Sequence, residues 1–461
     1  MLTVFLTGML HRSECLKDIK RAFGATAAMR GGIVKDTLLG SYPKLAALVD
    51  GTLTSILKDT TDAGASDISD SQTTEFFAMC APIESEYLAS IKARIESIAT
   101  SAFPGGNRGL PSQVDLQSLA AQIHEEIKLA SVGQERLVNM VCGVIGSVLL
   151  TIVTQAENMA ADSGLVASVS TTCNPAQTRN ISLSKALEDV YRTMQSASSR
   201  LPAKSLRALE GPMERLRLVT YSLLLPIFRS QSAEMEKIIQ KMHSLNFGAE
   251  DGSESEVAES SSYVRDLMSS LMSFRHEYLS KCLLTSMSSG TPTVAHTMAV
   301  NMAGQVLTFW VKEASLVRPL TNPGKLQFAK DAAEIESGIE QHLMGPNRSS
   351  KSALMESVVQ FKSFRRLVFL DEHSMDSLQD SLNSLPITVI LHHLLSQLPP
   401  EIESPYTRNK LSVVQYSTWM DDHSDEEILK QLKATLETGR SKVKHPLVDM
   451  MIQIIDERQP L

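Results

Sequence analysis

Apolar residues recur every three or four positions along most of this 461-residue chain, in runs that end at clusters of Gly, Pro, Ser or Asn. One such run has its apolar face formed by Tyr263, Leu267, Leu271, Phe274 and Tyr278. In the same run, Arg265 and Asp266 fall on the opposite side. This spacing is that of an amphipathic helix, and no strand-like alternation between hairpin turns is long enough to form a sheet. The sequence therefore predicts an all-α fold.

The positions of the breaks divide the chain into four segments. A helical bundle over 1–102, incomplete at its amino-terminal end, is followed by a second bundle over 103–245. Residues 246–262 carry five acidic side chains and almost nothing to bury, which is typical of a solvated linker. A carboxyl-terminal bundle is expected over 263–461. Further breaks are predicted at Thr60–Gln72, Phe103–Gln113, Cys173–Asn180, Leu201–Lys204 and Pro319–Gly324.

Charge and cysteine usage limit the classes of function. A formal net charge of −8 opposes binding to nucleic acid or directly to an anionic membrane. Five cysteines, at spacings that fit neither a zinc ribbon nor a disulfide framework, indicate free thiols in the reducing cytosol. The opening MLTVFLTGML lacks the charged start and the cleavage site of a signal peptide. We interpret it as a helix entered part-way, as if the chain began inside a longer protein.

One uncharged stretch, Leu137–Gln155, is long enough to span a membrane. Its small and polar residues form one stripe, made by Asn139, Gly143, Ser147, Thr151 and Thr154. The rest of its surface is broad and apolar, made by Val138, Val141, Ile145, Leu149, Ile152 and Val153. This division favours a tightly packed bundle helix over a membrane helix.

Paired histidines, His392 and His393, together with the triplet Asp421–His423, suggest a metal site. Imidazole and carboxylate suit divalent ions, so a helical metallohydrolase is one hypothesis. Adjacent residues on a helix point about 100° apart, however, so the two histidines cannot share one ion, and one of them should be exposed. The residues after the triplet instead predict a helix start, with Ser424 as N-cap and Glu427 in the capping-box position. We expect no metal site.

No catalytic or cofactor-binding motif is recognisable in the sequence. Gly105-Gly106 lacks the Lys-Ser/Thr ending of a phosphate-binding loop, and Gly31-Gly32 lacks the spacing of a dinucleotide-binding turn. Neither a GxSxG elbow nor an HExxH motif occurs. We therefore expect a protein without enzymatic activity and without a cofactor.

Three blocks in roughly the last third of the chain carry a family resemblance. The first contains Arg318, Pro319, Leu320, Gly324, Lys325, Ala329, Asp331, Ala333 and Glu336. The second is Ser363-Phe364-Arg365 with Leu367 and Phe369, where Arg366 replaces a family proline. The third contains Pro386, Pro399, Glu401, Ser404, Pro405, Arg408, Trp419, Asp421, Asp422 and His423. Together they resemble the subunit 5 family of the conserved oligomeric Golgi complex, a vesicle-tethering assembly. Weaker similarity extends to Phe103–Gly106 and Glu86–Leu88, and the family's amino-terminal coiled-coil region is missing.

This resemblance implies successive helical bundles that form an elongated rod, as in subunits of other multisubunit tethering complexes. It implies a non-catalytic subunit that acts in retrograde transport within the Golgi. Its partners would be other subunits of the complex, especially subunit 7, and through them SNARE proteins, Rab GTPases and golgins. Its location would be the cytosol and the cytosolic face of the Golgi membrane, as a peripheral membrane protein. A helical-repeat scaffold from another pathway is the alternative.

Partner contacts are expected where aromatic and arginine side chains gather, because these residues concentrate interface energy. The candidates are Trp310, Arg318, Lys325, Phe364, Arg365, Arg408 and Trp419. Trp310 and Phe364 also suit a hydrophobic core, and Arg318 and Arg365 also suit the capping of helix ends. Both interpretations stay open at this point.

Overall fold

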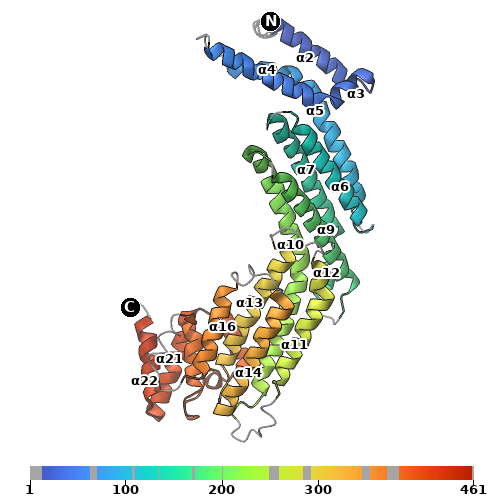
Figure 1. Cartoon of the computed structure of the whole chain (residues 1–461). Coiled ribbons are helices and arrows are strands. Elements are labelled where there is room, and N and C mark those ends of the chain that lie inside the picture. Colours follow the sequence, from blue (N-terminus) through green and yellow to red (C-terminus); the bar gives the residue numbers. More distant parts are fainter. Residues whose placement is uncertain are drawn as a thin grey trace. The chain divides into compact units, whose positions relative to one another are not determined.

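The computed structural model describes residues 13–62, 70–105, 109–133, 135–168, 172–199, 201–248, 259–283, 292–344, 354–370 and 384–458 (Figure 1). Every regular element within these ranges is a helix, so the predicted all-α class is confirmed for them. The chain forms two compact units. Unit 1 comprises Met1–Asp162 with Thr178–Leu223, and unit 2 comprises Ser163–Gln177 with Leu224–Leu461.

Unit 1 is built mostly from long helices that pack around one large core, and a smaller cluster of Val49, Met79 and Cys80 lies between two of them. Its elements are α2 (Ser13–Ala27), α3 (Ile33–Gly40), α4 (Tyr42–Asp62), α5 (Asp70–Ala102), α6 (Gln113–Ala130), α7 (Glu135–Met159), most of α9 (Pro175–Ser198) and the first half of α10 (Ala203–Gln240). The predicted break after α5 is confirmed. The break after α9 is confirmed in place, although α10 already begins at Ala203, and the break after α4 lies mostly outside the described residues, which leave out 63–69. The break predicted over Cys173–Asn180 is too long, because α9 already begins at Pro175. Proline is tolerated in the first helical turn, where its missing N–H costs no hydrogen bond.

Helix α7 contains the uncharged stretch and is long and apolar enough to cross a membrane. Its apolar side is nevertheless buried in the core of unit 1, whereas Gly143 and Thr154 of its polar stripe are exposed. Gly146 lies so close to α10 that an added Cβ would come within 3.2 Å of the Ala208 carbonyl oxygen. The structure thus shows the packed bundle helix that the polar stripe predicts.

Unit 2 consists of shorter helices around a second core. Its elements are α8 (Ser163–Val166), the second half of α10, η1 (Lys241–Ser244), α11 (Ser262–Phe274), η2 (Arg275–Leu279), α12 (Ser280–Cys282), α13 (Val294–Ser315), α14 (Asn322–Ile339), η3 (Glu340–Met344), α16 (Met355–Val368), α18 (Ile387–Leu395), α19 (Pro405–Arg408), α20 (Val413–Asp421), α21 (Asp425–Lys442) and α22 (Pro446–Arg458). The apolar face predicted from Tyr263 to Tyr278 is buried throughout, and Arg265 and Asp266 are exposed. Helix α16 continues through Arg366, so arginine in the family's proline position leaves this helix uninterrupted.

An aromatic cluster forms the centre of unit 2 and surrounds the buried side chain of Trp310 on α13. The indole ring contacts the rings of Phe328, Phe361 and Phe364 at centroid distances of 5.1 to 6.0 Å. Its Nε1–H donates to the Tyr263 hydroxyl at 3.1 Å. These contacts tie α11, α13, α14 and α16 together, because each helix supplies at least one of the rings.

The predicted acidic linker, 246–262, lies partly outside the described residues, which leave out 249–258. Both of its described ends pack on α14. Phe247 stacks on Phe328 with a centroid distance of 4.5 Å, and the Ser261 hydroxyl donates to Asp331 Oδ2 at 2.6 Å. The predicted division into four segments stays a prediction.

Gly324, in the first turn of α14, lies against Phe247 near the start of the predicted linker. A substitution at Gly324 therefore tests how closely Phe247 packs on α14. An alanine Cβ at this position would lie 2.2 Å from the Phe247 carbonyl oxygen, which also accepts a hydrogen bond from Thr321 N. Backbone atoms cannot move away as a flexible side chain can. We therefore expect Gly324→Ala to lower the free energy of unfolding by about 1–3 kcal/mol, the usual cost of overpacking, as measured by urea denaturation followed by circular dichroism.

The matched control for this substitution is Gly143→Ala. Gly143 is exposed inside α7, and a Cβ there would meet no atom within 4 Å. Alanine should leave stability unchanged or raise it by up to about 1 kcal/mol, because it favours helix more than glycine does. Equal effects of the two substitutions would contradict the close approach at Gly324.

Candidate partner-binding groove

Two of the seven predicted partner contacts lie in the core. The side chains of Trp310 and Phe364 are 1% and 0% exposed, and both belong to the aromatic cluster of unit 2. A side chain without accessible surface cannot touch a partner of the folded chain. The partner-contact prediction is therefore corrected for these two residues, which have the core role that their aromatic character also allowed.

Three further candidates connect elements of unit 2. Arg318 donates to the carbonyl oxygens of Leu398–Pro399 at 3.1 and 2.7 Å, just after the end of α18. Arg365 on α16 pairs with Glu336 on α14 at 2.9 Å. Lys325 is half-buried on the first turns of α14. The two arginines thus join neighbouring elements of unit 2, and neither of these contacts is the helix cap that was the alternative for them.

The last two candidates, Arg408 and Trp419, line one groove of about 550 Å³. They are eleven residues apart in the sequence, and the structure brings them together through α19, α20 and α21. The full lining is Arg408, Asn409, Trp419, His423, Glu427, Lys430, Gln431, Ala434 and Thr435. A volume of this size is typical of ligand-binding sites, so this groove is the candidate functional site.

Each helix that lines the groove begins at a serine N-cap. Ser404 caps α19 by accepting from Thr407 N, while Ser412 starts α20 with a reciprocal capping box. Ser424 starts α21 with a second capping box, in which its hydroxyl accepts from Glu427 N and the Glu427 side chain accepts from Ser424 N. The predicted capped start of α21 is confirmed. The caps satisfy backbone N–H groups at each helix start, so three helices can begin within about twenty residues of one another.

Trp419 is held in place by two rings of its own chain segment, one that precedes it and one that follows it in the sequence. Its ring lies 5.5 Å from that of Tyr416 and 4.1 Å from that of His423, with interplanar angles of 15° and 27°. His423 is fixed in turn because its Nδ1 bonds to the Trp419 carbonyl oxygen at 2.7 Å. The indole is therefore a preorganised aromatic surface on the groove.

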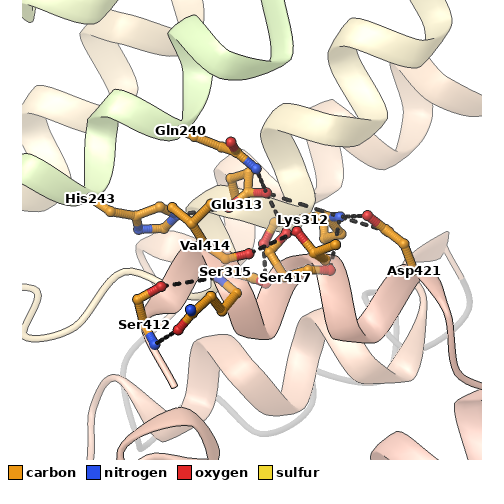
Figure 2. A network of polar contacts seen from close by, with 11 residues as sticks. Gln240, His243, Lys312, Glu313, Ser315, Ser412, Val414, Ser417 and Asp421 are labelled. Carbon is orange, nitrogen blue, oxygen red and sulfur yellow. Dashed lines mark hydrogen bonds and ion pairs between the residues drawn. The ribbon is translucent and has the colours of Figure 1, made fainter. Parts of the chain in front are cut away.

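A network of polar contacts attaches α20 to the rest of unit 2, and Figure 2 shows it at close range. Its centre is Glu313 on α13, whose side chain is fully buried. The Glu313 carboxyl group accepts from the Ser417 hydroxyl on α20, and its Oε2 lies 2.7 Å from His243 Nε2 on η1. Beside it, Lys312 Nζ contacts the two Asp421 carboxylate oxygens at 2.7 and 2.8 Å.

Sequence reasoning missed Glu313. It stands near the end of VAHTMAVNMAGQVLTFWVKEAS, where a charged residue after lysine normally indicates a solvated helix end. The signal that it offered is weak: the preceding residues are apolar on nearly all sides, so the helix is expected to be buried and any carboxyl group on it needs buried partners.

The residues proposed for a metal site do not converge. Among the described residues, no group of three His, Cys, Asp or Glu side chains could hold an ion. Asp421 pairs with Lys312, Asp422 ends α20 as its C-cap, and His423 stacks on Trp419. The hypothesis of a shared ion therefore has no geometric support in this part of the chain.

The expectation that one of the paired histidines is exposed is wrong, because both are buried. His392 Nδ1 lies 2.6 Å from the Thr388 carbonyl oxygen, and His392 Nε2 lies 3.0 Å from the Tyr416 hydroxyl. A carbonyl oxygen can only accept, so Nδ1 carries the proton and Nε2 accepts from Tyr416. His393 instead packs edge-on against Phe364 at 5.5 Å. Burial lowers the pKa of each histidine to about 4, and the nearby Lys325 charge contributes for His393.

These two histidines should make unit 2 sensitive to acid. Above their ordinary pKa near 6.5 they are neutral in both the folded and the unfolded chain. As the pH falls from about 6.5 toward 4, the unfolded chain takes up protons that the folded chain resists, so the free energy of unfolding decreases. Each histidine contributes up to about 1.4 kcal/mol per pH unit over this range. Urea midpoints measured at pH 7 and pH 5 should differ less in His393→Leu, and an unchanged difference would contradict this assignment.

Comparison with known proteins shows which proteins this chain is similar to. No protein-family model matches the chain. The chain is 30% identical over 449 residues to conserved oligomeric Golgi complex subunit 5 from Arabidopsis thaliana, which covers 95% of this chain and 52% of that protein. The chain is a homologue of this subunit. The resemblance inferred from the three sequence blocks is thus confirmed.

The mouse subunit 5, from Mus musculus, is 26% identical over 395 residues, with 82% of this chain and 45% of that protein covered. The chain therefore spans about half the length of the curated subunit 5 relatives that it matches. Among solved structures, the C-terminal domain of the exocyst subunit Sec6p aligns with a TM-score of 0.45 and 12% identity, over 82% of this chain and 94% of that one. The yeast exocyst component Exo70p aligns with a TM-score of 0.20 and 10% identity, over 96% and 99%.

Proposed function

We propose that the chain is a non-catalytic subunit of a Golgi vesicle-tethering complex and acts by protein–protein contacts in retrograde transport within the Golgi. The observation that carries this proposal is the 30% identity to conserved oligomeric Golgi complex subunit 5 over 95% of the chain. The helical architecture suits the role, because a helix rises about 1.5 Å per residue and long helices hold binding surfaces far apart.

The proposal extends to partners and location. Other subunits of the complex, subunit 7 among them, are the expected direct partners, and SNARE proteins, Rab GTPases and golgins are expected to be reached through the assembled complex. The expected location is the cytosol and the cytosolic face of the Golgi membrane. Free thiols at Cys80, Cys142, Cys173 and Cys282 agree with a reducing compartment.

Affinity purification of the tagged full chain from cells that express the other subunits tests this function. We expect several subunits of the conserved oligomeric Golgi complex to co-purify with the chain and not with the tag alone. Recovery of a different set of proteins in their place would favour a helical scaffold from another pathway. Recovery of no subunit at all would reject the proposed function.

A further inference from the structure

Three hydrogen-bond donors in the groove have no partner among the described residues. The Arg408 guanidinium and the Lys430 ammonium are exposed and make no ion pair or hydrogen bond there, and the indole N–H of Trp419 has no acceptor there. Most other cations of unit 2 for which contacts are described are paired, as Lys312 is with Asp421 and Arg365 is with Glu336. Lys430 is nevertheless close enough to Glu427 for its charge to act on that carboxylate, so Arg408 is the groove cation that has neither an ion pair nor a hydrogen bond in this part of the chain.

The one carboxylate in the lining is already engaged. Glu427 Oε2 accepts from both the backbone N–H and the hydroxyl of Ser424 at 3.0 Å. Asn409 Nδ2 donates to Gln431 Oε1 at 2.5 Å, which fixes the end of α19 beside the second turn of α21. Asn409 follows Arg408 and Gln431 follows Lys430 in the sequence, so this contact joins the two segments that carry these cations. A ligand would consequently meet Arg408, Lys430 and an aromatic ring, together with the Glu427 carboxylate, which keeps its negative charge.

We propose that this groove binds an acidic linear segment of a partner protein, with a carboxylate between Arg408 and Lys430 and a neighbouring apolar or aromatic side chain against Trp419. Charge-assisted bonds from guanidinium to carboxylate are among the stronger hydrogen bonds in proteins. Aromatic surfaces next to arginine are where interface energy concentrates. The inference that this partner is a subunit of the tethering complex rests on the proposed function, whereas the chemistry of the groove does not.

The surroundings of the groove favour a peptide segment over a membrane or a nucleic acid. Asp422, Asp425 and Glu426 are exposed around the start of α21, outside the lining. A bilayer or a phosphate backbone would bring many negative charges against these carboxylates, at a cost in repulsion. A narrow segment can place one or two carboxylates at the Arg408 side and keep away from the acidic turn. The groove thus selects for a ligand with localised negative charge.

Binding can be measured with the purified full chain and a defined probe. The probe is a fluorescein-labelled peptide with three acidic residues around one tyrosine, and its counterpart has lysine in place of each acidic residue. We expect the acidic peptide to bind, as followed by fluorescence anisotropy, and the lysine peptide to bind at least about tenfold more weakly. Quenching of tryptophan fluorescence by iodide gives a second readout. Of the two tryptophans, Trp310 is buried, so a change in quenching when the peptide binds reports Trp419.

Charge reversal at the groove is the decisive comparison. Arg408→Glu and Lys430→Glu should each weaken binding of the acidic peptide about tenfold or more. Arg366→Glu is the matched control, since Arg366 is an exposed arginine on α16 outside the lining, and it should bind as the original chain does. Unchanged urea midpoints for both groove variants confirm that they fold.

The outcomes separate this inference from the proposed function. Equal binding of the acidic peptide by the original chain and both groove variants, or no binding of either peptide, would overturn the groove assignment. Sedimentation with phosphatidylserine vesicles that depends on Arg408, without binding of the acidic peptide, would overturn it in favour of a membrane. Either result leaves the tethering proposal intact if complex subunits still co-purify with the chain. If instead the acidic peptide binds but no complex subunit co-purifies, only the tethering proposal is rejected.

Discussion

Replacing Glu313 by alanine is expected to lower the free energy of unfolding of unit 2 by about 1–3 kcal/mol for each buried donor that is left without an acceptor. The substitution leaves the Ser417 hydroxyl and the His243 ring, which both contact the Glu313 carboxyl group, without an acceptor in a site closed to water. Urea denaturation followed by tryptophan fluorescence reports this unit, because Trp310 and Trp419 both belong to it.

Asp421→Asn is the control for this prediction. Asp421 is 57% exposed and its contact with Lys312 lies at the edge of the same network. Exposed ion pairs contribute about 0–1 kcal/mol, so this substitution should shift the urea midpoint far less. Similar losses of unfolding free energy in the two variants would show that the exposed ion pair, and not the buried Glu313 carboxyl group, accounts for the stabilisation.

Trp310→Ala should destabilise unit 2 by a similar amount, about 3–5 kcal/mol, because it removes a large core side chain and leaves a cavity. It also deprives the buried Tyr263 hydroxyl of its indole donor at 3.1 Å. Circular dichroism is the appropriate measurement, since the substitution removes one of the two tryptophans.

Trp310→Phe separates the two causes of this loss. Phenylalanine keeps much of the ring contact with Phe328, Phe361 and Phe364 but has no N–H to donate. The smaller side chain should therefore recover most of the stability that alanine loses. A loss as large as that of alanine would assign the effect to the Tyr263 hydrogen bond instead of to packing.

Local sequence patterns were sufficient for several helix faces and for the capped start of α21. The face from Tyr263 to Tyr278, the polar stripe of α7 and the cap formed by Ser424 and Glu427 each depend on residues a few positions apart, where helical spacing alone decides the outcome. The capped start of α21 was thus predicted correctly. In the same part of the sequence, the prediction that one of the paired histidines is exposed was wrong.

The contacts that attach α20 to the rest of unit 2 depend instead on residues far apart in the sequence. Lys312 and Asp421 are separated by 109 positions, and no periodic pattern in either segment indicates that they meet. The burial of both His392 and His393 has the same origin, because α18 is enclosed on all sides. A run such as ITVILHHLL, apolar around the whole helix, was the available sign of that enclosure. Arg408 and Trp419 were selected by residue type, but their shared groove emerged only from the packing of three helices.

The attachment of α20 to α13 also determines which way Trp419 faces. Neighbouring residues of α13, Lys312 and Glu313, hold Asp421 and Ser417, which lie one turn apart along one side of α20. Two such attachment points prevent the helix from rotating about its own axis. Because each residue advances by about 100° around a helix, Trp419, midway between them in sequence, is fixed on the opposite side. Together with the bond from the Tyr416 hydroxyl to His392 Nε2, these attachments determine which face of the indole the groove presents to a ligand.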